Sequence, residues 1–155
     1  TGDEDDYERT LDRALNGATP QVQIRHLTAL AEFPDADLIR RTCALAISDD
    51  VKTQNAPFLL RAAIANRDHG PIAWEFVRRN WTDLNERFPR NTIVRMVESV
   101  RLLDRPDQVA DVHGFFAEHR IEQSQKTLDQ ILERQRINAV VREREAARLE
   151  RSLLG

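Results

Sequence analysis

A stripe of large apolar residues at helical spacing constrains the middle of this chain. Because positions three or four apart lie on one side of an α-helix, the pattern predicts a helix over residues 71–87 with that side buried. Phe76 lies roughly opposite Trp74 on this helix, which indicates that neighbouring elements cover it from two directions. We expect a buried core here, formed by Trp74, Phe76, Val77, Trp81, Leu84 and Phe88.

Helical spacing of apolar residues recurs along the rest of the chain. It predicts further helices over residues 3–16, 19–32, 36–48, 57–66, 91–103 and 107–118, and one or two more over 123–152. All six prolines fall between or at the starts of these segments, and no segment alternates strictly as a half-buried strand does. The class is therefore all-α, as antiparallel helix pairs in a HEAT-like or armadillo-like superhelix, or as a compact irregular bundle.

Two of these segments carry specific burial predictions. Ile24 is expected to face inward from its helix together with Leu27. In the last segment an apolar face is predicted from Leu128, Ile131, Leu132, Ile137, Val141, Leu149 and Leu153, with any break between residues 138 and 143. The arginines and glutamates from Arg134 to Arg151 are interpreted as a solvated face of ion pairs four residues apart.

Composition and charge exclude several classes of protein. The chain has 155 residues, with 41% hydrophobic and 32% charged, which favours a single all-helical domain over residues 1–155. A net charge of -3 with both signs interleaved gives no nucleic-acid surface, and no apolar run is long enough to span a membrane. The first residue is Thr1 and not methionine, so we expect a piece of a longer chain.

The sequence shows no catalytic constellation and no metal-ligand spacing. A zinc-protease helix needs histidines four apart with a glutamate beside the first, and none of the four histidines satisfies this. His113 and His119 are six apart and would point about 240° away from each other around a helix. Cys43 is the single cysteine, so we expect a small buried side chain in a reducing, cytoplasmic compartment.

One polar loop is a candidate for contact with a ligand. Residues 48–55 precede an apolar helix, and Lys52, Gln54 and Asn55 are long polar side chains that could face a groove. The alternative interpretation, a loop that only caps the helix, remains open at this point.

Several separated motifs resemble a known family. They are Val51-Lys52-Thr53-Gln54-Asn55-Ala56-Pro57, Asn66 with Gly70, Ala73-Trp74-Glu75-Phe76, and Asn80-Trp81 with Leu84 and Phe88. Val112, Phe115, Phe116 and His119, and then Lys126-Thr127-Leu128 with Glu133 and Asn138, continue the pattern. In this order they resemble the C-terminal helical domain of the M1-family zinc aminopeptidases, which include aminopeptidase N and puromycin-sensitive aminopeptidase. One departure is Val141, where that family commonly has an aromatic residue.

The resemblance implies a non-catalytic cap that walls the substrate chamber and controls which peptides reach the zinc. The zinc ligands and catalytic residues of that family lie in preceding domains, so this chain is expected to hold no cofactor itself. Its expected partners are the catalytic domain of the same polypeptide and the peptide substrate, and the isolated piece is expected to self-associate. The alternative from fold alone is a free-standing helical-repeat module for protein interaction.

Overall fold

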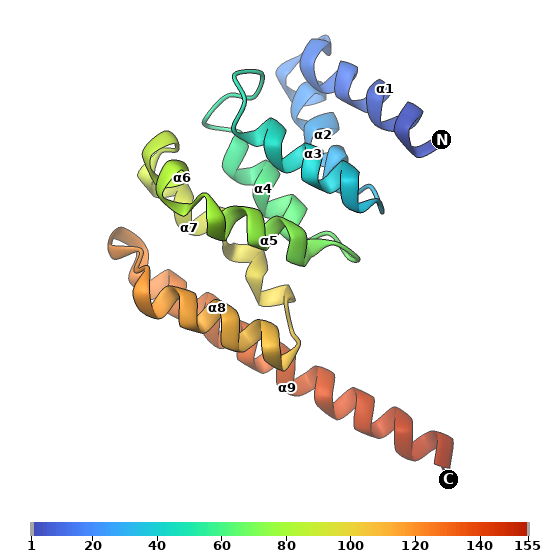
Figure 1. Cartoon of the computed structure of the whole chain (residues 1–155), viewed down its shortest axis with the longest axis vertical. Helices are drawn as coiled ribbons and strands as arrows, with labels where there is room; N and C mark the ends of the chain where they lie inside the picture. The colour runs from blue at the N-terminus through green and yellow to red at the C-terminus, as the bar shows by residue number, and fades with distance from the viewer. Residues whose placement is uncertain (1, 155) are drawn as a thin grey trace. The chain divides into compact units, whose positions relative to one another are not determined.

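The computed structural model describes residues 2–154, and in this range every regular element is an α-helix or a 3₁₀ helix. The chain divides into two compact units, residues 1–97 and residues 98–155 (Figure 1). The all-α prediction is confirmed.

The first unit stacks helices that follow each other in the chain. Its α-helices are α1 (Gly2–Asn16), α2 (Pro20–Leu30), α3 (Ala36–Ala46), α4 (Ala56–Ile64), α5 (Gly70–Arg79), α6 (Trp81–Arg87) and α7 (Ile93–Met96). Helix α1 packs on α2, and α4 contacts α2, α3, α5 and α7. Because neighbours surround α4, most of its residues are buried, as its nearly continuous apolar sequence requires.

Local sequence fixes where the first helices begin and end. The Thr19 hydroxyl accepts a hydrogen bond from the backbone N of Val22, and the Asp35 carboxylate accepts from the backbone N of Asp37 and Leu38. Between α1 and α2, a Cβ on Gly17 would lie 2.6 Å from the carbonyl O of Arg13. The turn therefore needs glycine for close packing.

The helix predicted over 71–87 is two helices, α5 and α6, separated at Asn80. The Asn80 side-chain Nδ2 donates to the carbonyl O of Phe76 at 2.8 Å, and this local bond helps to end α5. The stripe is nevertheless buried on both sides of the break, through Trp74, Val77, Trp81, Leu84 and Phe88. Phe76 differs from the prediction, because it is only half-buried and lines a surface depression beside α3.

The prediction of one continuous helix over residues 91–103 is also wrong. The structure has instead a 3₁₀ turn η1 (Arg90–Thr92), α7 and a second 3₁₀ turn η2 (Glu98–Leu102). This segment is rich in β-branched residues, among them Thr92, Ile93, Val94, Val97 and Val100, which favour a regular helix less than straight side chains do. The boundary between the two units falls in this segment.

The second unit consists of η2, α8 (Pro106–Glu118), η3 (Glu122–Ser124) and α9 (Gln125–Leu154). Helix α9 packs on η2 and α8. Three polar side chains of α9 hold the end of η2 and the residues that follow it. Gln135 Nε2 donates to the carbonyl O of Leu103, Asn138 Nδ2 donates to the carbonyl O of Arg101, and Arg142 forms an ion pair with Asp104, each at 2.8 Å. The bonds from Gln135 and Asn138 supply partners for carbonyl groups at the end of a 3₁₀ turn.

Helix α9 corrects several predictions. It runs unbroken through residues 138–143, and all of residues 141–154 are exposed. Leu128 and Ile131 are buried, whereas the predicted face does not continue inward at Ile137, Val141, Leu149 and Leu153, whose exposed fractions are 43% to 80%. The apolar spacing continues there, but no other described part of this unit covers it. Ile24 is similarly 46% exposed and not in the core.

Candidate functional site

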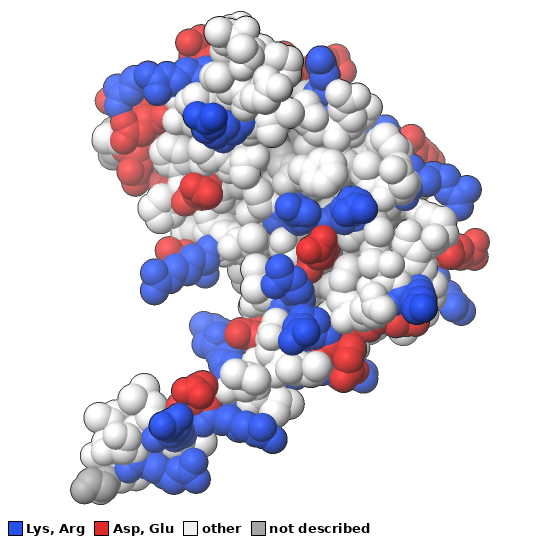
Figure 2. All heavy atoms as spheres, turned by 180° about the vertical axis from the view of Figure 1, so that it is seen from behind, with Lys and Arg blue, Asp and Glu red and all other residues white. Residues whose placement is uncertain are grey.

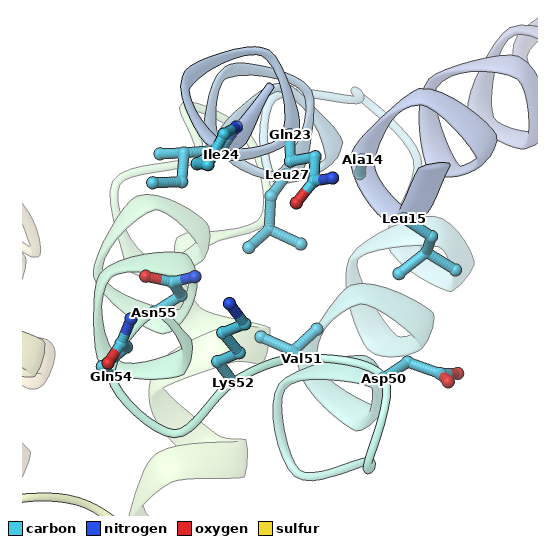
Figure 3. A pocket seen from close by; sticks show the side chains of 11 residues that line it. Ala14, Leu15, Gln23, Ile24, Leu27, Asp50, Val51, Lys52, Gln54 and Asn55 are labelled. Atoms are coloured by element: carbon cyan, nitrogen blue, oxygen red, sulfur yellow. The ribbon is translucent and has the colours of Figure 1, made fainter. Parts of the chain in front are cut away.

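A pocket of about 210 Å³ lies in the first unit, between α1, α2 and the loop that precedes α4 (Figure 3). Lys52, Gln54 and Asn55, the three residues singled out from the sequence, all line it. The structure therefore brings the three together in one concave site. The apolar wall opposite them includes Leu15, Ile24 and Leu27.

The loop that carries these residues is held by the first turn of α4. The backbone N–H groups of Asn55 and Ala56 both donate to the carbonyl O of Lys52, at 2.9 and 3.0 Å. The carbonyl O of Asn55 in turn accepts from the backbone N of Phe58 and Leu59. Because the backbone from Lys52 to Asn55 is tied to a buried helix, its side chains project from a fixed support.

Lys52 supplies the positive charge of the pocket. Its Nζ points into the space below Gln23 and Leu27, whereas the Asp50 carboxylate on the same loop points away (Figure 3). Among the described residues, Lys52 forms no ion pair with a carboxylate. The Asn55 side chain makes no capping bond to its helix. An ammonium group and amide groups beside an apolar wall can bind a peptide's carbonyl or carboxylate oxygens, and they provide no nucleophile or acid–base pair.

Sequence reasoning missed the other half of the pocket. Gln23 and Ile24 come from α2, roughly thirty residues before Lys52, and no spacing in the chain connects them to the loop. The Gln23 side-chain Nε2 donates to the carbonyl O of Gly17 at 2.9 Å, which fixes this residue at the pocket wall. Ile24 was expected in the core, and its exposure is explained by its place in the wall.

The other residues with potential chemistry do not form a site. Cys43 is fully buried, and burial raises the pKa of its thiol to about 12, so the reactive thiolate is suppressed. His119 Nδ1 donates to the carbonyl O of Phe115, while burial is the main cause that lowers the pKa of His113. Within residues 2–154 no three His, Cys, Asp or Glu side chains are grouped as a metal ion requires.

Charge and hydropathy add two further observations. Positive and negative side chains are interspersed over the face seen in Figure 2, as the near-balanced composition predicts. No helix in the described part of the chain combines the length and the apolar character needed to cross a bilayer.

The first unit is a stack of α-helices with a partly polar pocket between α1, α2 and the loop before α4. The sequence pattern of the ERAP1-like C-terminal domain matches residues 1–137, and the chain belongs to this family. Relatives in Oryza sativa subsp. japonica are aminopeptidase M1-A, 30% identical over 134 residues, and aminopeptidase M1-C, 27% identical over 135 residues. Each match covers 86% of this chain but only 15% of the relative. The predicted resemblance to the C-terminal domain of M1 aminopeptidases is confirmed.

Proposed function

We propose that this chain is the non-catalytic cap of an M1 aminopeptidase, walling the substrate chamber and controlling the access of peptides. The observation that carries the proposal is the family match over residues 1–137 together with the pocket that joins Lys52, Gln54 and Asn55. A supported ammonium group beside amides and an apolar wall is suited to hold a peptide without cleaving it.

The complete protein would remove N-terminal residues from peptides. The zinc ion and the residues that hold it would belong to another domain of the same polypeptide, which would be the permanent partner of this chain. We place the protein in the cytoplasm, where a lone unpaired Cys43 is compatible with a reducing environment.

The first experiment tests whether the chain is catalytic. Aminoacyl chromogenic substrates are incubated with the isolated chain and added zinc, and we expect no hydrolysis above the buffer control. The reading frame upstream of Thr1 is sequenced in parallel, and we expect it to encode a His-Glu-x-x-His helix. Zinc-dependent hydrolysis by the isolated chain would contradict the proposal. A reading frame without the zinc motif would favour a free-standing interaction module.

The second experiment tests the pocket in the complete enzyme. Lys52→Ala should reduce kcat/KM by about ten-fold or more for peptides long enough to reach the pocket, because a hydrogen bond to a charged group contributes about 1.5–3 kcal/mol. It should leave kcat/KM for a single aminoacyl chromogenic substrate unchanged. Lys126→Ala is the matched control, because Lys126 is the only other lysine and is exposed in the second unit. Equal effects of Lys52→Ala on long and short substrates would show that the pocket takes no part in controlling peptide access.

A further inference from the structure

The distal half of α9, residues 138–154, lies beyond the part of the chain that matches the family. At about 100° per residue, Ala146, Leu149 and Leu153 fall within roughly 60° of one another around this helix. We call these three residues the distal stripe. The same side of α9 is buried nearer its start, at Leu128, Ile131, Gln135 and Ala139.

The distal stripe therefore continues a buried helix face beyond the point where this unit covers it. Arg142 lies on the same side of α9 and forms an ion pair with Asp104. Leu149 and Leu153 beyond it are 63% and 80% exposed. An apolar helix face left in solvent indicates a surface that a partner covers.

Charges in this half of α9 are sorted by side. Its glutamates, Glu143, Glu145 and Glu150, lie on the two flanks of the distal stripe. Arg144, Arg148 and Arg151 lie on the opposite side of the helix. In Figure 2 the distal part of α9, at the lower end of the view, shows more blue than red.

The predicted ion pairs between glutamates and arginines four residues apart are therefore not formed in this half of α9. No glutamate and arginine in residues 142–151 are four positions apart. In the described part of the chain, Glu143, Glu145 and Glu150 take part in no ion pair. The acidic flanks are therefore available to a partner.

The acidic flanks also decide which partner fits. Two copies of α9 paired through the distal stripe would place glutamates beside glutamates in either orientation, which is unfavourable at the flanks of a two-helix seam. An anionic lipid surface is also disfavoured, because its negative charge would repel the glutamates. We propose that residues 138–154 dock an amphipathic helix of a partner that carries lysines or arginines on both sides of its own apolar stripe. This surface is separate from the pocket, and the inference does not depend on the proposed function.

The test uses the whole chain and two labelled synthetic peptides of about three heptads, each with leucine at positions a and d. One peptide has lysine at positions e and g, and the other has glutamate there, so that like charges oppose self-association of either peptide. Fluorescence anisotropy gives the Kd of each. We expect the lysine peptide to bind at least about ten-fold more tightly than the glutamate peptide at low salt.

Variants separate the distal stripe from general charge attraction. The double variant Leu149→Asn with Leu153→Asn should weaken binding of the lysine peptide by about ten-fold or more. Leu154→Asn is the matched control, because Leu154 is 83% exposed in the same helix but lies about 100° from the middle of the stripe. The triple variant Glu143→Lys, Glu145→Lys and Glu150→Lys should reverse the preference between the peptides. Circular dichroism checks that each variant keeps its helices.

Several results would overturn the inference. These are equal affinity for the two peptides, wild-type affinity in the double variant, or equal weakening by Leu154→Asn. A dimer of the chain in sedimentation that the double variant dissociates would also overturn it, because a second copy would then occupy the stripe.

Discussion

The side chain of Asn66 ties two turns of the first unit together, and its Nδ2 donates to the carbonyl O of Ala31 at 2.8 Å. The same nitrogen donates to the carbonyl O of Phe33 at 3.0 Å. Its Oδ1 accepts from the backbone N of Asp68 and of His69, at 3.1 and 3.0 Å. One amide thus joins the turn after α2 to the turn before α5, which explains in physical terms why an asparagine stands at this position.

Asn66→Asp should therefore destabilise the chain. A carboxylate cannot donate to the carbonyl groups of Ala31 and Phe33, and its charge would repel both oxygens. We expect the free energy of unfolding to fall by about 2 kcal/mol, measured by urea denaturation. Asn85→Asp is the matched control, because Asn85 donates only to the carbonyl O of Trp81 in its own helix. A change within about 0.5 kcal/mol is expected for Asn85→Asp, and equal effects at both sites would show that Asn66 is not a tie between turns.

Trp74 and Trp81 should contribute more to the free energy of unfolding than Phe76, which lies between them in the sequence. Trp74 and Trp81 are 4% and 9% exposed. Trp74→Ala and Trp81→Ala should each lower the free energy of unfolding by about 3–5 kcal/mol, because each opens a cavity. Phe76→Ala should cost about 1 kcal/mol, since this ring is only half-buried. Urea midpoints near wild type for either tryptophan variant would contradict burial of the stripe.

Gln135 offers a test of the second unit. Its side chain is fully buried, and its Nε2 donates to the carbonyl O of Leu103 at 2.8 Å. Gln135→Leu leaves that carbonyl without its partner and should lower the free energy of unfolding by about 1–3 kcal/mol. Gln130→Leu changes an exposed position of the same helix and serves as control. If the two variants melt at the same temperature, the buried bond contributes nothing measurable.

Cys43 should be unreactive until the chain unfolds. Its thiol is fully buried, and burial raises its pKa from 9.0 to about 12. A thiol reagent at pH 8 should label Cys43 at a rate that rises steeply only across the urea transition. Because the unfolded thiol ionises first, stability is unaffected by this group below pH 9 and decreases as pH rises from 9.0 towards 12. Cys43→Ala should remove that part of the alkaline decrease, and rapid labelling in the absence of urea would show an accessible thiol.

The pocket shows how far sequence analysis reached. Lys52, Gln54 and Asn55 were identifiable because a polar loop precedes a strongly apolar helix, and polar side chains there have a fixed support. Gln23 and Ile24 were not identifiable, because the contact of α2 with this loop depends on how whole helices pack. The same reason explains why Ile24 was wrongly predicted to be in the core.

The sequence by itself determined the all-α class, the buried stripe from Trp74 to Phe88 and the family, because helical spacing, prolines and ordered motifs are local properties of the chain. Only the tertiary structure decided that Asn80 separates two helices and that residues 90–102 form a short α-helix between two 3₁₀ turns. Only the tertiary structure, too, left Leu149 and Leu153 in solvent. The spacing of apolar residues states which side of a helix is apolar, whereas burial depends on whether another element lies against that side.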